Sequence, residues 1–238
     1  MFSFRVTARL TLLTGVALTA AGLAMPAFAV TVTPAIDNDD LAEIAETVRA
    51  PKTEDPVHVL CETTIESSGR TQYVMCVSRP EGMKEHEQAA IRALKKVRLT
   101  PAEVNGKRVR VATPISVVFI PGDDTRVIAV PNDGRQAEKY GFDYTSPQRL
   151  GDVNWNCISQ GSRRLARSGK DCNSTRTKFL MDFHVDEYGQ VSECEIHRVA
   201  PLARLSGDVC AQVDRFIPGI VNGEPRPMRY IEPLWSGS

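Results

Sequence analysis

Apolar and polar residues alternate along two early stretches of the chain, in the pattern of a β-hairpin. The stretches are residues 57–66 and 70–79, and Gly69 lies in the turn between them. Residues 85–97 then carry alanine, leucine and valine at helical spacing, with basic residues at the C-terminal end, where they suit the helix dipole. Residues 107–121 contain another apolar run, which predicts a third strand.

The same order of patterns returns near the C-terminus. Two alternating runs flank Gly189, and a shorter helical pattern covers residues 205–216. The sequence R-L-T-P-A-E-V-N-G at 98–106 also matches R-F-I-P-G-I-V-N-G at 215–223. The last apolar run is interrupted by Pro225, Pro227 and Pro233. Proline has no N–H to donate to a neighbouring strand, so we expect this strand to be an edge strand or mostly irregular.

This repeat predicts an α+β fold with two ββαβ units, each a three-stranded antiparallel sheet with one helix on its face. The leader contains a helical pattern at residues 37–50 that would pack on the first unit, and residues 126–131 are rich in β-branched residues, as in a strand. We expect a signal peptide at residues 1–29, a leader with a short helix at 30–55, the first unit at 56–121, a linker or insertion with a disulfide loop at 122–177 and a divergent second unit at 178–238.

The N-terminus has the composition of an export signal. Arg5 and Arg9 precede an apolar stretch, and Ala27 and Ala29 are the small residues that a signal peptidase recognises. We therefore expect cleavage after Ala29 and a periplasmic protein. The alternative is an uncleaved inner-membrane anchor, because the apolar stretch has about the length of a membrane span.

The charge balance gives no support to binding of nucleic acid or of an anionic membrane surface. The chain has 29 basic and 29 acidic residues, and loss of Arg5 and Arg9 with the signal leaves 27 basic against 29 acidic, a formal charge of −2.

Six cysteines follow the expected signal, and an even number in an exported chain indicates disulfides. Fifteen pairings are open to six cysteines, and we expect the sequential one. The first pair lies symmetrically about the turn at Gly69, the second brackets a short polar loop, and the third would join the predicted second helix to its sheet. The pairs would be Cys61–Cys76, Cys157–Cys172 and Cys194–Cys210.

The first unit resembles the C-terminal domain of TonB, the periplasmic energy transducer of Gram-negative bacteria. The resemblance lies in S-x-G-R at 67–70, the alanine-rich helix, R-x-x-P-A-x-x-N-G-K-x-V at 98–109 and the strand VRVATPISVVF at 109–119. The second unit matches more loosely, so the resemblance implies two copies of this domain in tandem. The leader lacks the long proline-rich spacer of an energy transducer.

The resemblance implies a non-catalytic protein that binds an extended segment of an outer-membrane receptor beside the third strand, in service of energy-dependent transport. An exposed sheet edge offers unpaired N–H and C=O groups, and an added strand satisfies them. The expected partner-binding residues on the third strand are Arg110, Val111, Ala112, Thr113, Ile115 and Ser116.

An alternative is a structural envelope scaffold in which the tandem units cover these edges themselves or the chain forms a homo-oligomer. An enzyme is not expected, because the sequence has no nucleophile motif of the G-x-S-x-G type. A metal or another cofactor is not expected either, because the four histidines are scattered and no C-x-x-C occurs.

Overall fold

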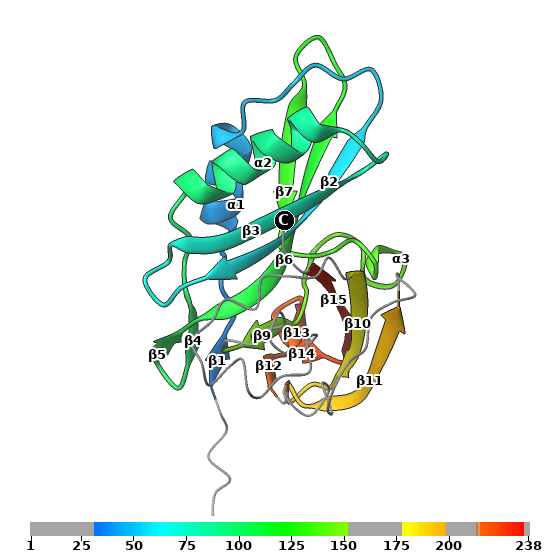
Figure 1. The fold of residues 1–238 in the computed structure, drawn as a ribbon. Helices are drawn as coiled ribbons and strands as arrows, with labels where there is room; N and C mark the ends of the chain where they lie inside the picture. The colour runs from blue at the N-terminus through cyan, green and yellow to red at the C-terminus, as the bar shows by residue number, and fades with distance from the viewer. Residues whose placement is uncertain (1–30, 152–177, 199–212, 214, 236–238) are drawn as a thin grey trace, which may run out of the picture.

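The computed structural model describes residues 31–151, 178–198, 213 and 215–235 (Figure 1). It is a mixed α+β fold. All strand pairings between the described strands are antiparallel, and three helices occur among the described residues. The predicted fold class is therefore confirmed at this level. The predicted signal peptide and its cleavage site lie outside the described residues.

The first hairpin pattern lies in the largest sheet. Strand β2 (Val57–Ile65) lies between β3 (Thr71–Arg79) and β6 (Val111–Ile120), as predicted. The sheet is wider than predicted, because strands from the linker and from the second repeat join it in the order β12-β9-β6-β2-β3, with β7 also paired to β6. The prediction of three strands is wrong for this sheet; the added strands are β7 (Arg126–Val130), β9 (Gln148–Leu150) and β12 (Phe216–Ile217).

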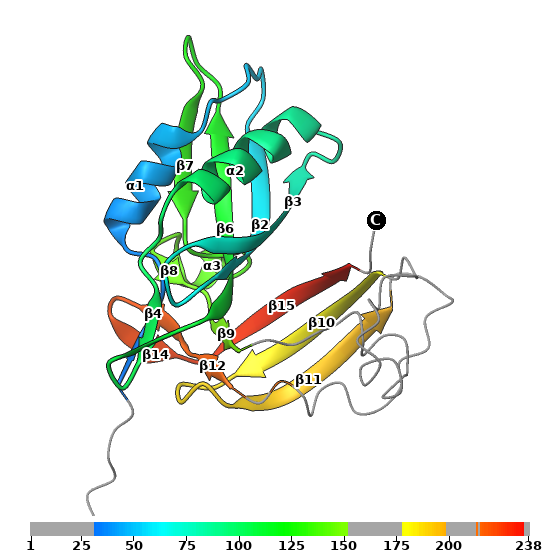
Figure 2. The same ribbon diagram turned by 60° about the vertical axis from the view of Figure 1, so that its left-hand side comes forward.

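Two helices, α1 (Asn38–Thr47) and α2 (Lys84–Lys96), cover one face of this sheet (Figures 1 and 2). Alternate side chains of β2 point toward them and are fully buried with the alanines of α2, as expected for a half-buried strand. The core contains Ile44, Val59, Cys61, Ala90 and Leu94, among others. The residues of β2 between these point to the opposite face.

Helix α1 forms within the predicted stretch. Asp37 caps it by accepting a hydrogen bond from the Asp40 N–H (2.9 Å), and the Asp40 carboxylate accepts one from the Asp37 N–H (3.0 Å), which completes a capping box. Both polar groups of the Gln148 side chain in β9 bond the main chain of Ala35, at 2.7 and 3.0 Å. The leader is thereby fixed to the large sheet.

The second repeat supplies a smaller sheet (Figure 2). Strand β10 (Lys178–Val185) lies between β11 (Val191–Arg198) and β15 (Met228–Trp235), the same order as β2 between β3 and β6. Strand β15 contains Pro233 and is an edge strand of this sheet, as expected. Most of the predicted second helix lies outside the described residues, although its last residue, Phe216, belongs to strand β12.

Two short hairpins repeat as well. Strand β4 (Ala102–Val104) pairs with β5 (Lys107–Val109) and with β1 (Val32–Thr33). In the same way, β13 (Gly219–Val221) pairs with β14 (Glu224–Arg226) and with β8 (Tyr144–Thr145). The short helix α3 (Ala137–Tyr140) precedes β8 in the chain.

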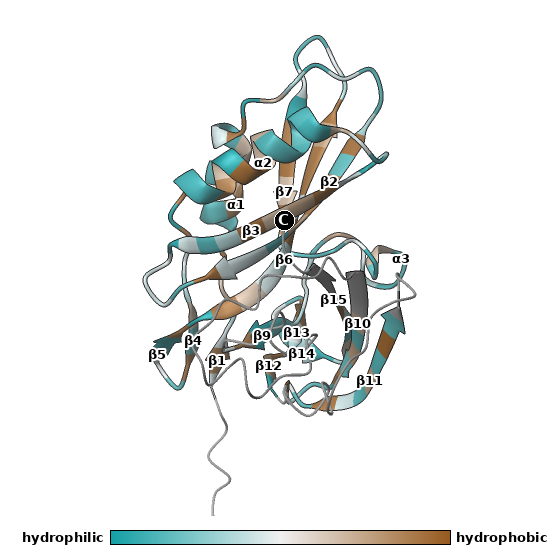
Figure 3. Cartoon of the chain, viewed as in Figure 1, coloured by the Kyte–Doolittle hydropathy of each residue, from teal (hydrophilic) through white to brown (hydrophobic). Residues whose placement is uncertain are grey.

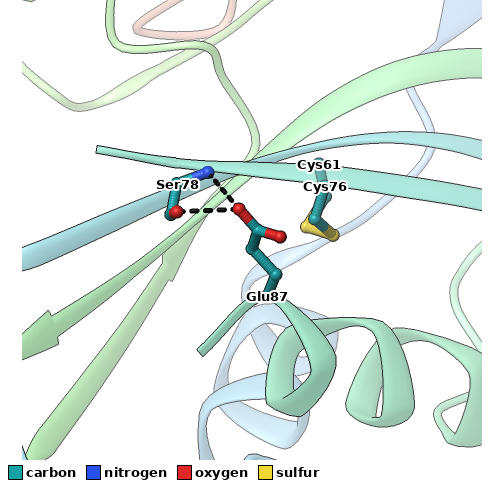
Figure 4. Close-up of a disulfide and its surroundings, with 4 residues drawn as sticks. All are labelled: Cys61, Cys76, Ser78 and Glu87. Carbon is teal, nitrogen blue, oxygen red and sulfur yellow. Dashed lines mark hydrogen bonds between the residues drawn. A yellow bond between two sulfur atoms is a disulfide. The ribbon is translucent and has the colours of Figure 1, made fainter. Parts of the chain in front are cut away.

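The predicted disulfide between Cys61 and Cys76 is confirmed (Figure 4). Cys194 is also disulfide-bonded. The other three cysteines, Cys157, Cys172 and Cys210, lie outside the described residues, so the remaining two predicted pairs stay predictions.

Candidate functional site: the sheet edges and the junction of the two repeats

The predicted partner-binding edge on β6 is closed within the chain. Ser116–Ile120 pair with β7, and Val111 and Ala112 pair with β9. The side chains of the predicted edge within β6 are buried, at no more than 2% exposed; they are Val111, Ala112, Thr113, Ile115 and Ser116. The expectation of a free edge at this strand is therefore wrong.

The cause is visible in the composition of β6. Residues 115–120 read ISVVFI, a nearly continuous apolar run, which is typical of a strand covered on both faces and not of an exposed edge. Arg110 lies just before this strand. Its guanidinium forms an ion pair with Glu66 (3.2 Å) and hydrogen-bonds the Gln72 side chain, so it contacts the β2–β3 hairpin.

The opposite edge of the sheet, along β3, pairs with no strand in the described part of the chain. The Cα atoms of Cys61 and Cys76 are 4.0 Å apart, which is the close spacing of a non-hydrogen-bonded antiparallel pair. The N–H and C=O groups of Cys76 therefore point away from β2. By the two-residue period of a strand, those of Val74 do the same.

Helix α2 contacts β3 at both ends of the stretch that carries these outward-facing N–H and C=O groups. At one end, the Glu87 carboxylate of α2 accepts hydrogen bonds from the N–H (2.9 Å) and the hydroxyl (2.7 Å) of Ser78 (Figure 4). At the other end, the Thr71 hydroxyl bonds the Leu94 carbonyl (2.9 Å). Within the described residues, the outward groups of Val74 and Cys76 have no hydrogen-bond partner.

The middle of β3 is also uncharged and apolar. Residues 71–78 read TQYVMCVS, and Figure 3 shows the strand coloured as hydrophobic along its middle. The Tyr73 side chain is 50% exposed. Long, uncharged edge strands invite pairing with another chain, which natural proteins usually prevent with charges, prolines or covering elements.

The other long edges carry such protection. Strand β11 has Glu193, Glu195 and His197, and β15 contains Pro233, which has no N–H to donate. The Gln136 side chain also bonds the Arg229 carbonyl of β15 (3.2 Å). Strand β7 has only five residues and packs against α1. The edge of β3 is thus the longest uncharged one in the described structure.

The two repeats meet on the face of the large sheet opposite the helices. Tyr230 of β15 stacks its ring in the aromatic core of the second repeat, 5.1 Å from Phe216 and 6.3 Å from Phe183. Its hydroxyl donates a hydrogen bond to the Glu62 carboxyl of β2 (2.7 Å). One side chain therefore joins the core of one repeat to the sheet of the other.

A second buried contact lies beside it. The Arg149 guanidinium of β9 binds both carboxylate oxygens of Glu232, at 2.7 and 2.8 Å, in the bidentate geometry that suits arginine. Glu62 is 7% exposed and Glu232 is 3% exposed. Burial, and next the charge of Glu232, raise the pKa of Glu62 to about 8.

The rest of the described structure offers few groups for chemistry. A pocket of about 430 Å³ lies between the leader, the β7–β8 connection and the β13–β14 hairpin, and Asp143 and Tyr144 are the titratable residues among its described lining. Among the described residues, no group of three or more His, Cys, Asp or Glu side chains could hold a metal ion. Across the same ranges, no helix is long and apolar enough to span a membrane.

Sequence reasoning missed both the β3 edge and the junction. The uncharged run at 71–78 was a readable signal for the edge. The junction had no such signal in the sequence, because Glu62 and Tyr230 are 168 positions apart and neither breaks the pattern of its own strand. Comparison of the chain with known protein families, curated proteins and solved structures finds no match.

Proposed function

We propose that this chain is a non-catalytic, exported interaction protein that binds an extended segment of another envelope protein by β-strand addition at the edge of β3. The observation that carries the proposal is the pair of outward-facing N–H and C=O groups at Val74 and Cys76, which lie in the uncharged stretch 71–78 of β3 and have no partner among the described residues. An extended peptide would pair with these N–H and C=O groups. The export signal expected from the sequence and the even number of cysteines support an envelope location.

An extended peptide makes a simpler demand on this edge than a second copy of the whole domain. Helix α2 packs over β3 and β2, as the Glu87–Ser78 and Thr71–Leu94 contacts and the shared core show. A second copy paired edge to edge would bring its own α2 to the same face, where the two helices would have to pack with 8–10 Å between their axes. A peptide has no helix to place there.

The side chains of β3 indicate which peptides would bind. On the face away from the helices, Tyr73 and Met75 would lie beside alternate residues of the added strand, so apolar or aromatic residues are favoured there. A receptor of the TonB-dependent class is the partner that the family resemblance implies, and transport is the role that would follow.

The test is capture of partners from detergent-solubilised envelopes with residues 30–238 as bait. Val74→Pro removes one outward N–H and no N–H of the β2–β3 ladder, so it should abolish capture of the partner. Val74→Ala is the matched control, since it also shortens this partly buried side chain but keeps the N–H. Equal capture by all three baits would contradict strand addition at β3.

The second candidate is a structural scaffold. It is favoured by the closure of the β6 edge, where strands from the linker and the second repeat pair within the chain. A scaffold would self-associate in light scattering and would capture only itself from envelopes, with no dependence on Val74.

A further inference from the structure

Among the described residues, the hydrogen bonds at the junction of the two repeats join two buried carboxyls, Glu62 and Glu232, and one cation, Arg149. Arg149 binds both oxygens of Glu232, while Glu62 accepts its hydrogen bond from Tyr230. Burying an ionised carboxylate without a matching cation is strongly unfavourable, whereas a neutral carboxyl needs only hydrogen bonds. The arrangement therefore suits Glu62 in its protonated form.

The groups around Glu62 act in both directions: burial and the nearby carboxylates raise its pKa, while the hydrogen bond from Tyr230 and the charge of Arg149 lower it, and the raising effects are larger. Strand β15 presents Tyr230 and Glu232, and the loop after β7 presents Asp133, whose negative charge also disfavours ionisation of Glu62. Strand β9 presents Arg149, the cation that acts in the opposite direction. On β3, Tyr73 lies near enough that Glu62 raises its pKa, although burial of Tyr73 is the larger cause.

We propose that Glu62 is a proton-controlled latch between the repeats: its neutral form holds the sheet of the second repeat against the large sheet, and its ionised form releases it. Tyr230 is the other half of the latch, because its ring belongs to the core of the second repeat and its hydroxyl bonds Glu62. The latch does not depend on peptide binding at β3.

The direction of the pH dependence follows from the two states. In the closed state the pKa of Glu62 is about 8, and in an open state with Glu62 in water it returns to its ordinary value of about 4.5. Between these values the closed state holds a proton that the open state has lost. The ratio of open to closed molecules therefore rises about tenfold per pH unit from about pH 5 to 8, and levels off above pH 8.

The experiment is small-angle X-ray scattering of residues 30–238 between pH 5.5 and 8.5. The wild type should expand as the pH rises and then reach a plateau. Glu62→Gln keeps a hydrogen-bond acceptor for Tyr230 but cannot ionise, so it should stay compact throughout. Glu54→Gln removes the same charge from an exposed residue and should behave as the wild type. A wild type of constant size, or expansion of Glu62→Gln equal to that of the wild type, would overturn the latch.

A second measurement covers the case in which Glu62→Gln does not fold. The carboxyl carbon of Glu62 can be titrated directly by NMR in the wild-type protein. A midpoint near pH 8 in the compact protein supports the latch, and a midpoint below pH 5 rules it out.

Discussion

Gly69 and Gly189 hold the same contact in the two repeats. Each has a positive φ, at 80° and 79°, and each packs its hairpin turn against a later segment of the chain, at Leu99 and at Phe216. The Gly69 carbonyl accepts from the Leu99 N–H (2.9 Å), and the Gly189 carbonyl accepts from the Phe216 N–H (2.8 Å). The repeat seen in the sequence is thus repeated in individual hydrogen bonds.

Replacement of Gly69 by alanine should destabilise the protein strongly. A Cβ there would lie 2.2 Å from the Leu99 carbonyl oxygen, in addition to the cost of a positive φ, which is roughly 1–2 kcal/mol for a residue with a side chain. Gly106→Ala is the control, because Gly106 has a positive φ of 71° but an open surrounding. Urea denaturation should show a clearly larger loss for Gly69→Ala, and equal losses would contradict the close contact.

Loss of the buried cation should be among the most damaging single changes. Arg149→Ala leaves the Glu232 carboxylate buried without its bidentate partner, and such changes cost about 3–5 kcal/mol. Arg108→Ala removes an exposed partner of Glu103 and should cost about 0–1 kcal/mol. Both values can be read from denaturant unfolding curves. A small effect of Arg149→Ala would mean that the junction is open in solution.

At the scale of elements, the first helix depends on its capping box. Asp37→Ala should lower the free energy of unfolding by about 1 kcal/mol, because the Asp40 N–H loses its acceptor. Asp39→Ala is the comparison, since Asp39 lies in the same first turn but does not cap the helix. Thermal unfolding of the two variants measures the difference, and equal melting temperatures would contradict the cap.

The elements that alternate or repeat locally could be predicted from the sequence. The β2–β3 hairpin, both long helices, the strand at β7 and the Cys61–Cys76 pair follow from short-range patterns. The pairing of β6 with β7 and β9 could not be derived in this way, because pairing between strands far apart in sequence leaves little trace in either strand. The apolar run in β6 predicts only that this strand is buried, and burial argues against an exposed edge.

At the scale of the whole molecule, the two edges of the first repeat's sheet differ in how they are covered. The linker and the second repeat close the β6 edge of the first, while α2 bounds the β3 edge at Ser78 and leaves its centre open. The junction at Glu62 lies on β2, directly opposite Met75 of β3 in the register. The proposed binding edge and the proposed latch are therefore on adjacent strands, although each is tested separately.

The most direct test of the central claim is amide hydrogen exchange along β3, resolved by NMR in the free protein and with the captured partner. We predict that the N–H groups of Val74 and Cys76 exchange fast in the free protein, while those of Tyr73, Met75 and Val77, which face β2, are protected. Binding of the partner should protect Val74 and Cys76 as well. Protection of these two amides in the free monomer, or their fast exchange in the complex, would contradict strand addition at this edge.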